Sequence, residues 1–157
     1  MSGWSSNWIP PKTKTDSMAA FLGLDYGKRR VGVAVGDDQR GIAFAHGTHR
    51  EGQDGSVIDY LAAIISERDI ATLVVGLPLR ADGSEGEITI AARKFAALLE
   101  ERLRLPVVLW DERFSSTEAD RWLIDRRKKA KEDRDALAAE IILQSYLDSL
   151  RAQGDAP

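Results

Sequence analysis

The sequence predicts an α/β protein built on a five-stranded mixed sheet with helices packed against it. Three short β-prone segments come first, and the apolar pattern then changes to a helical period near residue 57. The run ATLVVGL at residues 71–77 is apolar on both faces, which is typical of a covered parallel strand. Three strands, then a helix, a strand, a helix, a strand and two helices, combine antiparallel and parallel pairing in one sheet.

The first half of the chain supplies the antiparallel part. Strands are expected at residues 21–26 and 31–35, joined by a turn, with a third strand over about 42–48. Apolar residues at helical spacing then predict an amphipathic helix over 56–68.

The second half alternates helices and strands. After the strand at 71–77, the pattern predicts a helix over about 88–103, a strand at 106–110, a helix from Ser115 to about 125, and a helix over 134–151. Right-handed crossovers place the first strand and the two later strands parallel and central. Their carboxyl ends then meet at one edge of the sheet, where open α/β sheets carry their sites.

Length and composition limit the function classes. The chain has 157 residues, no cysteine and a formal net charge of −3. One domain, at residues 19–151, is expected between a flexible extension at 1–18 and a flexible tail at 152–157. Without cysteine there is no disulfide framework and no cysteine-ligated zinc. No apolar run reaches the roughly 18 residues of a membrane span. We expect a cytoplasmic protein without a membrane partner.

Acidic residues at the expected sheet edge are the candidate catalytic groups. Asp25 lies inside an apolar strand, where an unpaired carboxylate costs several kcal/mol unless it faces a metal or ordered donors. It could instead cap the following turn. Gly23 and Gly27 beside it would leave the backbone open to a large ligand.

Two further segments carry acids to the same edge. Asp111 and Glu112 end a strand, and because neighbouring residues alternate faces, only one of them can point towards Asp25. Asp135 opens the last helix, where an acid could simply cap the first turn. Together the acids form an oxygen-donor set that suits Mg²⁺ or Mn²⁺, and such ions promote phosphodiester cleavage.

Basic residues flank these acids in the chain, so the net charge is a poor guide to partners. One cluster directly follows the Asp25 strand, and residues 121–134 contain seven basic against three acidic residues. A solvated charged face is one interpretation. Beside a metal site we favour contacts to nucleic-acid phosphates. The candidate phosphate-binding residues are Lys28, Arg29, Arg30, Arg113, Arg126, Arg127, Lys128 and Lys129.

Four motifs, in this order and spacing, resemble a known family. They are FLGLDYGKRRVGVAV at 21–35, VVGLPL at 74–79 with DGSE at 82–85, DERFSSTEA at 111–119, and Asp135 with the apolar residues that follow it. Together they are similar to the YqgF/RuvX family of pre-16S rRNA nucleases, also called Holliday-junction-resolvase-like proteins. The resemblance covers about residues 20–150.

The resemblance implies an RNase H-like fold, a divalent-metal nuclease and a role in maturing small-subunit ribosomal RNA. It implies that Asp25, Glu112 and Asp135 are the catalytic, metal-binding acids, with Asp111 as a further ligand. Many RNase H-like nucleases carry an acid at the end of the fourth strand, whereas residues 75–77 here are Val-Gly-Leu. The Asp-Glu pair at 111–112 takes that place.

Three functions stay open at this point. The chain is an endonuclease for pre-rRNA, a Holliday-junction resolvase acting on branched DNA, or a non-catalytic module that binds RNA or ribosomal particles. A resolvase would favour a twofold dimer, because two strands are cut symmetrically. The sequence is compatible with a monomer or a weak homodimer.

Overall fold

The computed structural model describes residues 19–52, 55–114 and 133–154. Its elements follow the expected order, apart from the helix expected at 115–125, which lies outside the described residues together with the extension at 1–18. The elements are β1 (Ala20–Tyr26), β2 (Arg30–Asp37), β3 (Ala43–Arg50), α2 (Val57–Arg68), β4 (Ile70–Leu77), α3 (Glu87–Leu103), β5 (Val107–Asp111), the short 3₁₀ helix η1 (Glu112–Phe114) and α5 (Arg134–Gly154).

The sheet has five strands in the order β3-β2-β1-β4-β5. The β1–β2 and β2–β3 pairs are antiparallel, whereas β1–β4 and β4–β5 are parallel, which confirms the mixed sheet. One expectation about position is wrong: β5 lies at the edge of the sheet and not in its centre, because it pairs with β4 alone and the described residues contain no strand beyond it. Helix α5 also continues to Gly154, three residues past its expected end.

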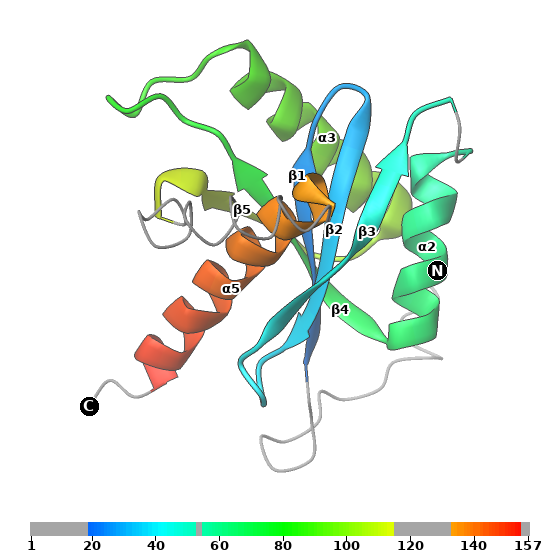
Figure 1. Cartoon of the computed structure of the whole chain (residues 1–157), viewed down its shortest axis with the longest axis vertical. Coiled ribbons are helices and arrows are strands. Elements are labelled where there is room, and N and C mark those ends of the chain that lie inside the picture. The colour runs from blue at the N-terminus through cyan, green and yellow to red at the C-terminus, as the bar shows by residue number, and fades with distance from the viewer. Residues whose placement is uncertain (1–18, 53–54, 115–132, 155–157) are drawn as a thin grey trace, which may run out of the picture.

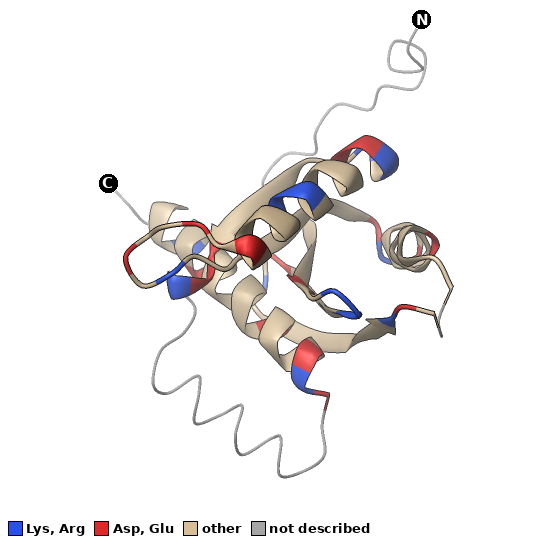
Figure 2. Cartoon of the chain, turned by 90° about the horizontal axis from the view of Figure 1, so that it is seen from above, with Lys and Arg blue, Asp and Glu red and all other residues tan. Residues whose placement is uncertain are grey.

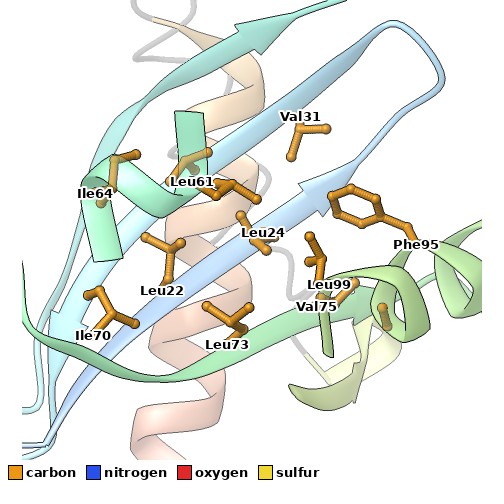
Figure 3. Close-up of a cluster of buried hydrophobic side chains, with 12 residues drawn as sticks. Leu22, Leu24, Val31, Leu61, Ile64, Ile70, Leu73, Val75, Phe95 and Leu99 are labelled. Atoms are coloured by element: carbon orange, nitrogen blue, oxygen red, sulfur yellow. The ribbon is translucent and has the colours of Figure 1, made fainter. Parts of the chain in front are cut away.

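The two faces of the sheet bury different cores. Leu22 and Leu24 of β1 point towards α2 and α3, in a cluster with Leu61, Phe95 and Leu99 among others (Figure 3). Phe21 points to the opposite face, where α5 crosses the sheet (Figure 1). Because side chains alternate along a strand, Asp25 lies on the α5 face with Phe21.

Helix α5 lies unusually close to the sheet because the strands beneath it carry glycine. A Cβ at Gly32 of β2 would overlap the backbone carbonyl oxygen of Asp135. A Cβ at Gly23 of β1 would lie 2.6 Å from the Cβ of Leu143. The helix backbone therefore rests directly on β2 at Gly32, and at Gly23 only the Leu143 side chain and the Ala139 carbonyl oxygen lie against β1.

The expected role in admitting a ligand is wrong for Gly23 and stays a prediction for Gly27. The space above Gly23 is filled by Leu143 of α5. Gly27 belongs to the tight β1–β2 turn, in which its backbone N–H donates to the carbonyl oxygen of Arg30 at 2.9 Å. A Cβ at Gly27 would lie 2.9 Å from that same oxygen. Gly23 therefore makes room for α5, whereas Gly27 makes room for the tight turn and also lines a cleft of about 360 Å³.

Side chains of α5 also cover the free edge of β3. The backbone N–H of Ala43 donates to Gln144 Oε1 at 2.9 Å, and that of Ala45 donates to Glu140 Oε1 at 2.8 Å. Edge strands with unpaired N–H groups invite pairing with other chains. The helix α5 thus covers one face of the sheet and also accepts hydrogen bonds from two N–H groups at the β3 edge.

No described helix is long and apolar enough to cross a membrane.

Gly32→Ala should lower the free energy of unfolding by about 3 kcal/mol or more, because the new methyl group would collide with helix backbone that cannot rotate away. Chemical denaturation measures this loss. The matched control is Gly154→Ala, at the end of the same helix, where nothing lies within 4 Å of the added Cβ. A Gly32→Ala protein as stable as this control would contradict the close packing of α5.

Candidate active site

Asp25 lies between two glycines on neighbouring strands. It pairs with Gly32 across the β1–β2 ladder. On the other side Leu24 pairs with Val75, so Gly76 is the next residue along β4 at the level of Asp25. Neither neighbour has a side chain, which leaves room above both for groups from other elements.

The two spaces beside Asp25 are filled by the other candidate acids. The backbone of Asp135, in the first turn of α5, lies directly over Gly32. The side chain of Glu112 lies over Gly76, where a Cβ would be 3.0 Å from its Cγ and 3.1 Å from its Cδ. Three acids that are distant in sequence therefore meet at the carboxyl end of β1, as expected.

The electrostatics of Asp25 agree with the proximity of the other two acids. Burial and, after it, the nearby charges of Glu112 and Asp135 together raise the pKa of Asp25 from 3.8 to about 7. Burial also raises the pKa of Glu112, with a second contribution from Asp111. A buried carboxyl group whose pKa is raised by neighbouring acids marks a candidate functional site.

Asp111 binds Arg113. The Arg113 guanidinium donates from Nε to both carboxylate oxygens at 3.1 and 3.0 Å, and from Nη2 to Oδ2 at 2.7 Å. These hydrogen bonds lower the pKa of Asp111. The expectation that only one of the adjacent acids faces Asp25 is confirmed, and that acid is Glu112. The metal role of Asp111 and the phosphate role of Arg113 stay predictions, and the two side chains bind each other.

Arg30 contacts the candidate site directly. Its Nε lies 3.1 Å from Asp135 Oδ2, with 57 % of the arginine side chain and 27 % of the aspartate side chain exposed. Sequence reasoning assigned Arg30 to phosphate and Asp135 to metal, and in this structure the two are paired.

The acids fit a hard divalent cation by their chemistry. Carboxylate oxygens are the donors that Mg²⁺ and Mn²⁺ prefer, and a cation beside Asp25 would offset the charge that raises its pKa. Within the described residues, however, no group of three or more acids or histidines already has the geometry to hold a metal ion. The three carboxylates supply suitable oxygen donors, but in this structure they are not arranged as the ligands of a single ion.

The other basic residues surround this end of the sheet. Lys28 and Arg29 are exposed in the β1–β2 turn and, with Arg30, line a cleft of about 360 Å³. Lys28 also lines a second, shallower cleft of about 710 Å³ with Arg80, against the start of α3. Figure 2, which looks down on the molecule from this end, shows acidic and basic segments interspersed. Arg126, Arg127, Lys128 and Lys129 lie outside the described residues.

Sequence reasoning missed the two glycines that make room for the site. Gly32 and Gly76 were available as a signal, because glycine in the interior of a strand often marks a close approach by another part of the chain. Their partners, residues 135 and 112, are too far away in sequence for that signal to identify them.

Comparison with known proteins matches residues 18–149 to the family described as "RuvX: Holliday junction resolvase". The chain belongs to the RuvX family. The expected family is confirmed over nearly the whole described domain.

Curated RuvX relatives carry the name "Putative pre-16S rRNA nuclease". The protein from Geobacillus kaustophilus is 46 % identical over 137 residues, covering 83 % of this chain and 98 % of the relative. The protein from Rhodobacter capsulatus is 41 % identical over 142 residues, covering 88 % of this chain and 89 % of the relative.

Solved structures establish the RNase H-like fold of this RuvX chain. RuvC from T. thermophilus, solved in complex with a Holliday junction substrate, aligns with a TM-score of 0.60 at 13 % identity over 85 % of this chain and 96 % of that one. Fowlpox virus resolvase, solved with Holliday junction DNA, aligns with a TM-score of 0.51 at 11 % identity over 83 % and 98 %. The expected fold is confirmed.

The raised pKa of Asp25 predicts a distinctive pH dependence of stability. The pKa is about 7 in the folded chain against 3.8 for an unperturbed aspartate, so the folded state binds the proton more tightly. The contribution of Asp25 to stability is therefore greatest below pH 4, declines as the pH rises towards 7, and is level above. Asp25→Asn, which mimics the protonated acid, should remove this decline.

The measurement is chemical denaturation of both proteins across this pH range in the presence of a chelator. The two should be about equally stable at acid pH, and the variant more stable by about 2–4 kcal/mol above pH 7. A difference that does not change with pH would show that Asp25 is already ionised in the folded chain.

Proposed function

We propose that this protein is a divalent-metal-dependent endonuclease that cleaves phosphodiester bonds during 5′-end maturation of pre-16S rRNA in the cytoplasm. The observation that carries the proposal is the convergence of Asp25, Glu112 and Asp135 at the carboxyl end of β1, where burial and mutual repulsion raise the pKa of Asp25 to about 7. Such a cluster is unfavourable unless a cation occupies it.

Asp25, Glu112 and Asp135 would hold Mg²⁺ or Mn²⁺. When bound, the ion supplies activation of the attacking water and stabilisation of the leaving oxygen. The chain's own contribution is to fix the acids on three separate elements, so that each carboxylate is held by the backbone of a strand, a 3₁₀ turn or a helix. Lys28 and Arg29, exposed in the turn that follows the Asp25 strand, would orient the phosphate backbone without reading its sequence.

Ribosomal RNA is favoured over branched DNA by the degree of similarity. The relatives named for pre-16S rRNA are 41–46 % identical to this chain. The structural neighbours solved with Holliday junctions are only 11–13 % identical, and at that level they support the fold alone. The pre-rRNA, alone or in a ribosomal particle, is therefore the proposed substrate.

Asp25→Asn and Glu112→Gln should each lower the cleavage rate by at least about a hundredfold, since both remove charge from the set that holds the ion. The assay uses purified protein, Mg²⁺ or Mn²⁺, and an RNA spanning the 5′ end of 16S rRNA, with a four-way DNA junction in parallel. Asp59→Asn, on α2 on the opposite side of the sheet, is the matched acidic control and should cleave at the wild-type rate.

Each outcome separates the candidate functions. Cleavage of the junction and not of the RNA would favour a resolvase. RNA binding that survives chelation and Asp25→Asn, without any cleavage, would favour a non-catalytic assembly module. In cells, depletion should leave extended 16S 5′ ends that wild-type protein corrects and Asp25→Asn does not, and normal ends after depletion would exclude the rRNA assignment.

A further inference from the structure

The Arg30–Asp135 ion pair joins two residues that are each expected to bind something else. Arg30 is a candidate for binding phosphate, and Asp135 is a candidate for binding a cation. Their contact, 3.1 Å between Nε and Oδ2, engages a carboxylate oxygen that a cation would otherwise use. The ion pair thus involves one of the three converging acids.

The backbone determines that these two residues meet. Arg30 is the first residue of β2, two positions before Gly32, so both lie on the α5 face of the sheet. The first turn of α5 rests on Gly32, which places the backbone of Asp135 close to that of Arg30. The pair is thus a consequence of the close approach of α5 to the sheet.

The same pair is easy to exchange. More than half of the Arg30 side chain is exposed, so a phosphate group from solution can reach the guanidinium. Exposed ion pairs between side chains are weak. A guanidinium binds phosphate through two parallel hydrogen bonds, which is a better partner than a single Nε contact to a carboxylate.

We propose that Arg30 is a positioning residue that couples nucleic-acid binding to divalent-cation binding. Without nucleic acid Arg30 holds the Asp135 carboxylate, and when it turns to a backbone phosphate it releases that carboxylate to the cation. This inference rests on the proposed nuclease function.

The coupling predicts that nucleic acid and cation each raise the affinity of the protein for the other. Because linkage is reciprocal, a nucleic acid that removes Arg30 from Asp135 raises cation affinity by the same factor by which the cation raises nucleic-acid affinity. Removing the guanidinium should therefore produce, without any nucleic acid, part of the gain in cation affinity that the nucleic acid produces in the wild type.

The first experiment is calorimetric titration of the full chain with Mn²⁺ in the absence of nucleic acid. Arg30→Gln should bind Mn²⁺ about fivefold more tightly than the wild type, within the range of typical coupling between sites. Arg29→Gln removes the same charge one residue away and should change the affinity less than about twofold, which isolates the direct contact from general electrostatics. Arg30→Lys keeps the charge and should stay near the wild type.

The second experiment repeats the titration with a short single-stranded RNA oligonucleotide, whose integrity is checked at the end. The RNA should raise the Mn²⁺ affinity of the wild type more than that of Arg30→Gln, and the difference should match the gain measured without RNA. Thermal unfolding of each variant confirms that the fold is retained, as expected for an exposed side chain.

Equal Mn²⁺ affinities for Arg30→Gln and Arg29→Gln would overturn the inference and leave the proposed nuclease function intact, since that function is tested separately by cleavage. The same titration with Asp25→Asn shows whether Mn²⁺ binding depends on Asp25. If Mn²⁺ binding by the wild type and by Arg30→Gln did not depend on Asp25, both the coupling and the metal dependence of the proposed function would be excluded.

Discussion

The close approach of α5 to the sheet is the constraint on which the rest of the structure depends. It requires glycine at position 32, because any side chain there would meet the helix backbone at Asp135. From this contact follow the position of Asp135 beside Asp25, the second hydrophobic core on this face, and the cover over the edge of β3. Gly32 is therefore needed both for the packing of α5 on the sheet and for the position of Asp135 in the candidate active site.

The acidic cluster shows how a stable fold can tolerate an unfavourable group of charges. Leu22 and Leu24, on the same strand as Asp25, are fully buried in a core that does not involve the acids. That core lies on the other face of the sheet, with α2 and α3. Packing against α2 and α3 therefore holds β1 in place. The α5 face of the same strand can then carry a carboxyl group whose ionisation is costly.

Much of the fold could be predicted from the sequence, because hydrophobic period and turn residues are local signals. The strand at 71–77 and the convergence of Asp25, Glu112 and Asp135 were accessible in this way, since topology brings parallel strand ends together. The edge position of β5 and the task of Gly23 were not, because both depend on what packs across the sheet. The pairing of Arg30 with Asp135 joins positions 105 residues apart in the printed sequence, and no local pattern encodes it.

Because α5 is the last element in the chain, its packing on the sheet also affects folding during synthesis. Helix α5 follows all five strands in the sequence, so the sheet can begin to form on the ribosome while one of its faces is still bare. Until residues 134–154 emerge, the amide edge of β3 lacks Gln144 and Glu140, and Asp25 lacks one of its two acidic neighbours. A nascent chain therefore holds an incomplete set of carboxylates next to the ribosome that makes it, and the set is completed only when α5 docks.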